Sequence, residues 1–104
     1  MQQSTERINF GGINRAALAN VRAVLKCWLP DGRNEGQEYV ARNPKRVDRH
    51  LGSFKVNLQT GKWADFATGN AGGDLVSLAA YLAGLSQGEA ARRLAAMLGV
   101  NWRG

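Results

Sequence analysis

Hydrophobic residues in this chain recur at helical spacing near both ends and at every second position in the middle. This change of period divides the chain into a helical segment, a segment of strands and a second helical segment. At 104 residues the chain is large enough for one domain with a single core. The pattern therefore predicts an α+β fold in which helices pack against a small sheet.

The first periodic segment predicts one helix from Asn14 to about Trp28. Asn14 is a residue type that caps helices, and apolar residues recur at helical spacing after it: Ala17, Leu18, Val21, Val24 and Leu25. Residues 30–32, Pro-Asp-Gly, are typical of a turn and end the helix. Residues 31–36 are then expected to be a loop.

Three antiparallel strands are predicted in the middle of the chain, at residues 38–42, 53–58 and 62–66. The second alternates most clearly, because Phe54 and Val56 are expected to point into the core and Lys55 outward. Residues 59–61, Gln-Thr-Gly, supply the turn between the second and third strands. A sheet of this size needs helices packed against it to be stable.

Two helices are predicted in the last third of the chain. Asp74 is expected to cap the first helix and Gly84 to end it. Ser86 and Glu89 have the spacing of a capping box, which begins the second helix, and Gly99 ends that helix. The predicted fold is therefore a three-stranded antiparallel sheet with one N-terminal helix and two C-terminal helices.

The predicted domain extends over residues 13–100. Residues 1–12 are expected to form a flexible arm, and residues 101–104, including Trp102, a loose tail. No apolar run approaches the length of about 18 residues that a membrane helix needs, and the polar first residues lack the apolar centre of a signal peptide. We therefore expect a soluble, cytoplasmic protein without a membrane partner.

Positive charge is concentrated in the middle of the chain. The whole sequence has 14 Lys and Arg against 8 Asp and Glu, a formal net charge of +6. Between Val40 and Trp63, six basic residues face the single acidic residue Asp48, so this stretch carries 6 − 1 = +5 of the total. The six are Arg42, Lys45, Arg46, Arg49, Lys55 and Lys62. This density favours a polyanionic partner, although a solvated basic surface has the same composition.

Residue types that catalysis requires are sparse. His50 and Cys27 are the single histidine and cysteine, and neither has a neighbouring base or nucleophile. The carboxylates are scattered, unlike those that hold catalytic metals. The glycine-rich residues 69–74 lack the Lys-Ser/Thr ending of a nucleotide loop, and a tight turn explains them better, with amides that could meet one phosphate. We therefore expect no enzymatic activity and no cofactor.

Seven short segments occur in an order and spacing that a known family shares. They are residues 38–40 (Glu-Tyr-Val), 43–46 (Asn-Pro-Lys-Arg), 52–57 (Gly-Ser-Phe-Lys-Val-Asn), 61–63 (Gly-Lys-Trp), 66–69 (Phe-Ala-Thr-Gly), 71–74 (Ala-Gly-Gly-Asp) and 85–91 (Leu-Ser-Gln-Gly-Glu-Ala-Ala). In these segments residues 37–100 resemble the zinc-ribbon domain at the front of bacterial, phage and plasmid DNA primases. The resemblance implies a zinc-ribbon-like fold that binds single-stranded template DNA across its sheet during DNA replication, here of a mobile element.

The zinc ligands of that family are missing from this chain. The resemblance puts the ligand positions on Asn43, on Arg46, on Asp65 or Phe66, and on Thr68 or Gly69. Zinc in such ribbons needs four nitrogen or sulfur ligands, so we predict a metal-free domain. Because a structural zinc contributes much of a ribbon's folding energy, other contacts must replace it. We expect packing of Phe54, Trp63 and Phe66, with polar contacts from Asn43 or Asp65, to close the former site.

The predicted DNA-binding residues combine basic side chains with one aromatic ring. They are Arg42, Lys45, Arg46, Arg49, Lys55, Asn57, Lys62 and Trp63. Cations follow phosphates and rings stack on bases in single-strand sites, although Trp63 has the core as an equal alternative. A second interpretation is a metal-free protein-interaction module that docks a helicase, primase or polymerase. Primer synthesis would need a separate catalytic domain, which we expect beyond Gly104 if the chain is the front end of a larger primase.

Overall fold

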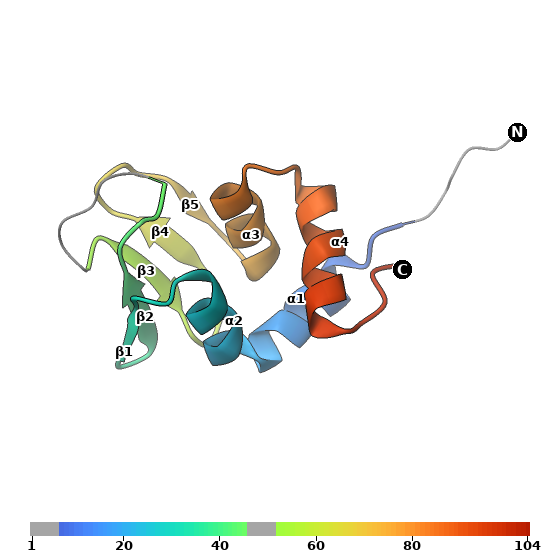
Figure 1. Cartoon of the computed structure of the whole chain (residues 1–104), viewed down its shortest axis with the longest axis horizontal. Coiled ribbons are helices and arrows are strands. Elements are labelled where there is room, and N and C mark those ends of the chain that lie inside the picture. Colours follow the sequence, from blue (N-terminus) through green and yellow to red (C-terminus); the bar gives the residue numbers. More distant parts are fainter. Residues whose placement is uncertain (1–6, 46–51) are drawn as a thin grey trace, which may run out of the picture.

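The chain folds with a sheet at one end and helices at the other (Figure 1). The structure is a computed structural model that describes residues 7–45 and 52–104. Its elements are α1 (Phe10–Ala19), α2 (Val21–Trp28), β1 (Arg33–Glu35), β2 (Glu38–Ala41), β3 (Phe54–Asn57), β4 (Trp63–Asp65), β5 (Ala71–Gly72), α3 (Leu75–Ala83) and α4 (Gln87–Leu98). The strands form one antiparallel sheet in the order β1-β2-β3-β4-β5. The predicted α+β class and antiparallel sheet are confirmed.

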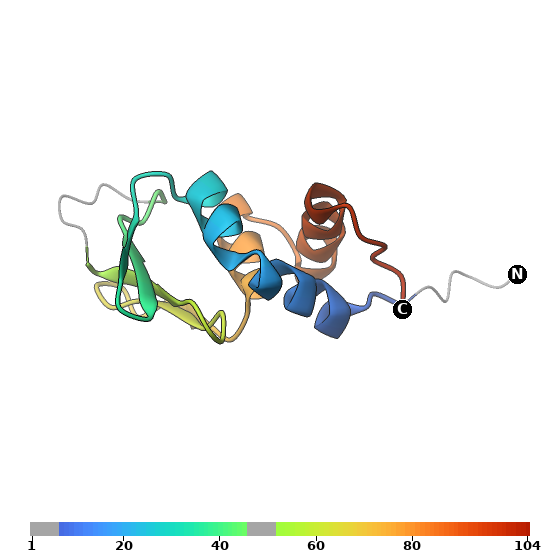
Figure 2. The same cartoon turned by 90° about the horizontal axis from the view of Figure 1, so that it is seen from below.

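One face of the sheet packs against α2 and α3 and forms the core (Figures 1 and 2). In β3, Phe54 and Val56 are buried and Lys55 is partly exposed, as the alternation predicted. Residues directly opposite one another in an antiparallel pair share a face. Tyr39 and Trp63 both lie opposite Val56, one from each neighbouring strand, and so they join the core.

The predicted single N-terminal helix is wrong in two respects. It is two helices, because the backbone turns at Asn20, whose N–H donates to the carbonyl of Ala17 and whose side chain bonds the carbonyl of Ala16. It also begins earlier, at Phe10, with Asn9 as its cap. Asn14 is no cap. Its Oδ1 accepts from the N–H of Val76 at 2.9 Å and ties α1 to the start of α3.

The predicted three-stranded sheet misses the short outer strands. Residues 33–35, expected to be a loop, pair with β2 as β1 through a two-residue turn at Gly36. Gly36 has φ 63, which matches a turn of the type that hairpins favour. Every residue of β1 is exposed, so no alternation of polarity could reveal it. β5 is two residues long and lies inside the glycine-rich stretch expected to be a turn.

The two C-terminal helices begin and end as predicted. The side chain of Asp74 accepts from the N–H of Ser77 at 2.8 Å, and Gly84 ends α3 with φ 69. The side chain of Ser86 accepts from the N–H of Glu89 at 3.2 Å, and α4 ends at a glycine with φ 73. Local sequence therefore determines both helices.

The C-terminal residues are not a loose tail. The carbonyl of Trp102 accepts from the N–H of Asn9 at 2.8 Å, and the N–H of Gly104 donates to the carbonyl of Arg7 at 2.7 Å. The Trp102 ring lies 4.9 Å from the guanidinium carbon of Arg92, a cation–π contact on α4. Pairing with the segment before α1 holds these residues in place. None of the helices in the described ranges is long and apolar enough to span a membrane.

Tyr39 allows a test of the contact between sheet and helix. Its hydroxyl donates to the carbonyl of Leu29 at 2.7 Å, and burial, with a smaller contribution from Asp31, raises the pKa of Tyr39 above 10.0. We expect Tyr39→Phe to lower the free energy of unfolding at neutral pH by about 1 kcal/mol, the usual contribution of one hydrogen bond.

The same variant should change how stability depends on pH. When the pKa of a tyrosine is higher in the folded than in the unfolded chain, its contribution to stability is fully present below the unfolded-state pKa. That contribution is lost as the pH rises through the folded-state pKa. The difference in unfolding free energy between wild type and Tyr39→Phe should therefore shrink above pH 10.0. Urea denaturation of both proteins across this range measures it, and a constant difference would contradict the assignment.

Candidate nucleic-acid interface

The outer face of the sheet carries no helix in the described chain (Figure 2). Strand alternation and direct pairing assign its residues, which are Arg33, Glu35, Glu38, Val40, Lys55, Asn57, Lys62, Ala64, Phe66 and Ala71. Val40 belongs to this face but is buried, whereas the β3 and β4 residues of this face are partly or fully exposed. This is the surface on which the predicted single-strand contacts depend.

A shallow hollow opens on this face, with a volume of about 340 Å³. We call it the sheet hollow. Its lining residues are Glu38, Lys55, Asn57, Thr60, Lys62, Trp63, Ala64 and Phe66. Two of them are lysines and one is an exposed aromatic ring, so the sheet hollow offers both kinds of group that a single nucleic-acid strand uses.

Phe66 supplies the aromatic ring of the sheet hollow. It is 70% exposed, the most exposed large apolar side chain in the described residues. The Nζ atom of Lys55 lies 5.8 Å from its ring centroid, which is a cation–π arrangement. The prediction that Phe66 closes the former zinc site is wrong, because it follows the inward Asp65 by one position and successive side chains of a strand alternate.

Trp63 lies in the core, on the opposite face from Phe66. It is 5% exposed, and its Nε1–H donates to Oγ of Ser77 on α3 at 2.9 Å. Its ring centroid lies 4.8 Å from that of Tyr81 and 5.9 Å from that of Phe54. Of the two alternatives for Trp63, the core position is therefore the one observed. The prediction that Trp63 stacks on a base is wrong. Sequence reasoning could not prefer Phe66 over Trp63, because the register of the strand decides which aromatic side chain faces outward.

The basic residues predicted to contact DNA lie on different parts of the molecule. Lys55 and Lys62 lie on the outer face, where Lys55 is 3.9 Å from a carboxylate oxygen of Glu38. Arg42 is exposed just after β2. Lys45 turns the other way, with its Nζ atom 5.3 Å from the ring of Tyr81.

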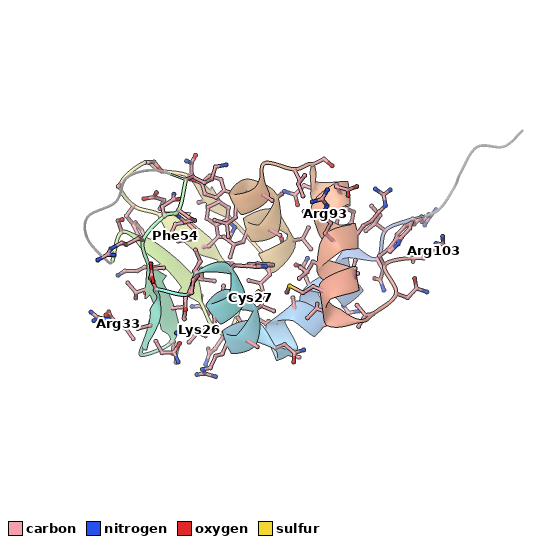
Figure 3. All side chains as sticks on the ribbon, in the orientation of Figure 1. Lys26, Cys27, Arg33, Phe54, Arg93 and Arg103 are labelled. Carbon is pink, nitrogen blue, oxygen red and sulfur yellow. The ribbon has the colours of Figure 1, made fainter. Side chains whose placement is uncertain are left out.

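Two further predicted contacts, Arg46 and Arg49, lie outside the described residues. Asn57 is partly exposed, but its Oδ1 accepts from the N–H groups of Gln59 and Thr60 and so orders the β3–β4 turn. The sequence analysis missed Arg33, which joins the outer face through β1 and forms an ion pair with Glu35 at 2.8 Å. Figure 3 shows Arg33 at the far end of the sheet.

A buried polar cluster lies beneath the sheet, at residues that the resemblance assigns to zinc ligands. Asn43 and Asp65 are 1% and 0% exposed. The Nδ2 group of Asn43 donates to Oδ2 of Asp65 at 2.7 Å and to the hydroxyl of Tyr81 at 2.8 Å. Oδ1 of Asp65 accepts from the N–H of Ala67, and Oδ1 of Asn43 from the N–H of Lys45. We call Asn43, Asp65 and Tyr81 the polar cluster.

The backbone of Asp65 extends this arrangement. Its carbonyl accepts from the N–H groups of Thr68 and Gly69, at 3.2 and 2.8 Å. The expected polar contacts of Asn43 and Asp65 and the expected packing of Phe54 with Trp63 are therefore present. Within residues 7–45 and 52–104, no group of three or more His, Cys, Asp or Glu is placed to hold a metal ion.

Tyr81 is the member of the polar cluster that sequence reasoning missed. Its hydroxyl also accepts from Nδ2 of Asn70 at 3.3 Å, and its ring stacks on Phe54 with centroids 6.3 Å apart. Ser77 and Tyr81 are four residues apart, so both face the sheet from α3. Two hydroxyl groups four residues apart on an otherwise apolar helix are the sequence signal that could have indicated a polar contact with the sheet.

The glycine-rich residues before α3 do not leave an open phosphate site at the helix start. The N–H groups of Ser77 and Leu78 donate to Asp74, and that of Val76 donates to Asn14. Gly72 packs directly under the Trp63 indole, where an added Cβ would lie 2.4 Å from its Nε1 atom. Close packing explains this glycine.

Comparison with protein-family models gives no match for the chain. Comparison with curated proteins gives no match either. The likeness to primase zinc ribbons therefore stays a prediction.

The polar cluster should be important for stability. We expect Asn43→Ala to lower the free energy of unfolding by about 2 kcal/mol, because it removes partners from buried groups of Asp65 and Tyr81. Asn34→Ala, at an exposed asparagine of β1, is the matched control and should change little. Urea denaturation followed by circular dichroism measures both. Equal stability of the two variants would show that the cluster contributes nothing.

Metal independence is a separate prediction. If the fold needs no zinc, the urea midpoint should be the same with and without EDTA, and added Zn²⁺ should not raise it. A midpoint that falls in EDTA and recovers with Zn²⁺ would overturn the metal-free prediction.

Proposed function

We propose that this chain binds single-stranded DNA across the outer face of its sheet, with Phe66 stacking on a base and Lys55 and Lys62 contacting phosphates. The observation that carries the proposal is Phe66, a ring 70% exposed beside a lysine in the sheet hollow. An apolar ring left in water loses the stabilisation that burial would give it, and a base provides that burial.

An unpaired strand fits this surface better than a duplex does. The bases of a duplex are stacked on one another, so their faces are closed to an aromatic side chain. A single strand exposes those faces, and stacking on an aromatic residue contributes about 1–3 kcal/mol per base. The sheet hollow is open and shallow, which suits a splayed base, and Lys62 at its edge is exposed for a phosphate.

The biological role follows from the resemblance stated above. We propose a non-catalytic, template-binding module of DNA priming or replication, working beside a helicase, primase or polymerase of a mobile element. The basic composition supports the polyanionic partner, since the chain carries a formal net charge of +6.

Fluorescence anisotropy with labelled oligothymidylate tests the stacking contact. We expect Phe66→Ala to weaken binding by about tenfold, the equivalent of roughly 1.4 kcal/mol. Phe10→Ala is the matched control, because Phe10 is also exposed, at 39%, but lies on α1 away from the sheet. Equal affinities of the two variants would remove Phe66 from the site.

Salt dependence tests the phosphate contacts in the same titration. For a single strand the slope of log affinity against log salt falls by about 0.7 for each phosphate contact removed. Replacing Lys55 and Lys62 together should therefore reduce the slope, while Lys26→Ala on α2 should not. Replacing Arg46 and Arg49 tests the loop contribution predicted from the sequence. If labelled duplex or RNA bound more tightly than the single DNA strand, the proposed ligand would be wrong.

A further inference from the structure

A second surface lies at the helical end of the molecule, between α2, α3 and α4. It is a groove of about 310 Å³, which we call the helix groove. Apolar side chains form its walls, among them Trp28, Leu82, Leu94 and Met97, and Arg93 is the one charged lining residue in the part of the chain that the structure describes. Among the described residues, it shares no lining residue with the sheet hollow, and Lys55, Lys62 and Phe66 do not line it.

The helix groove is open because of how α4 packs on its neighbours. Ala90 and Leu94 of α4 are buried, while Met97, one turn further along the same stripe, is 46% exposed. Trp28 at the end of α2 is only partly buried. Met97 is three residues from Leu94 and so lies on the same side of α4, yet its side chain remains largely accessible. An apolar stripe left uncovered beside a hollow is a typical groove for a partner helix.

Charge defines what kind of segment fits. Among residues 7–45 and 52–104, no acidic residue lines the groove, and the side chain of Arg93 is 67% exposed. Arg92 and Arg93 share one carboxylate, that of Glu89, at 3.5 and 3.1 Å, so one positive charge remains uncompensated there. Figure 3 shows Arg93 on α4, on the helical end of the molecule. A second copy of this basic chain would bring like charges together at the groove.

We propose that the helix groove docks an acidic amphipathic segment of a partner protein. Apolar side chains of that segment, spaced three or four residues apart, enter between Leu82, Leu94 and Met97, and its carboxylates pair with Arg93. An arginine keeps further N–H donors for a second carboxylate while it bonds the first. Both ligands are anionic, but this interaction uses a different surface from the proposed DNA binding, because the described lining residues of the helix groove and of the sheet hollow do not overlap.

Selection from a phage library of random peptides of about 15 residues, long enough for four helical turns, tests the proposal. The immobilised bait is the full chain. We expect enriched peptides to combine Asp and Glu with Leu, Ile or Phe at spacings of three and four. Enrichment of basic or uncharged peptides, or no enrichment, would overturn the proposal.

The affinity of an enriched peptide for variants of the chain, measured by fluorescence anisotropy, then shows where the peptide binds. Met97→Glu and Arg93→Glu should each weaken it by about tenfold, and the Arg93→Glu loss should be reversed in part by exchanging the peptide's acids for lysines. Val100→Glu, at a residue 39% exposed, and Arg15→Glu on α1 are controls with the same charge change elsewhere. Peptide binding that survives Met97→Glu but fails when Lys55 and Lys62 are replaced would assign the peptide to the sheet hollow and reject the helix groove.

DNA binding of the same variants separates this proposal from the proposed function. Met97→Glu should lose the peptide and bind oligothymidylate with the same affinity as Val100→Glu. Circular dichroism melts confirm that each variant is folded. A Met97→Glu protein that melts with its controls and still binds the peptide at full affinity would refute the docking site even if DNA binding is established.

Discussion

The hydrogen bonds among Asn43, Asp65 and Tyr81 are the constraint on which the rest of the structure depends. They join three segments that are distant in the sequence, namely the end of β2, the end of β4 and the last turn of α3. Buried polar groups are costly without partners, and among the described residues every buried side-chain nitrogen and oxygen has one. These hydrogen bonds therefore favour one relative placement of sheet and helix, which gives the small core a defined geometry.

This constraint also determines what the outer face presents. Asp65 must point inward to reach Asn43, and Trp63, two residues earlier, points inward with it onto Tyr81 and Ser77. Because side chains of a strand alternate, Lys62, Ala64 and Phe66 then point outward. The exposed ring and the lysine of the proposed DNA site are thus placed by the same register that buries the carboxyl group. A shift of one residue would exchange the two sets.

The two proposed surfaces are made by different parts of the fold. The sheet hollow comes from β2, β3 and β4, and the helix groove from the open end of α4 against α2 and α3. One suits a polyanionic strand with exposed bases, and the other an apolar segment with acidic flanks. Because their described lining residues do not overlap, the two proposed ligands would not compete for the same side chains.

The sequence by itself determined the elements whose signals are local: the capped helices α3 and α4, the alternating strand β3 and its neighbours, and the core positions of Phe54 and Val56. Caps, turns and periodicity act within a few residues, so no distant contact is needed to see them. Only the tertiary structure decided that Asn14 bonds α3, that Trp63 is buried while Phe66 is exposed, and that Tyr81 completes the polar cluster. Those outcomes depend on strand register and on partners up to 62 residues away, and a polar or aromatic side chain does not by itself specify which partner it will find.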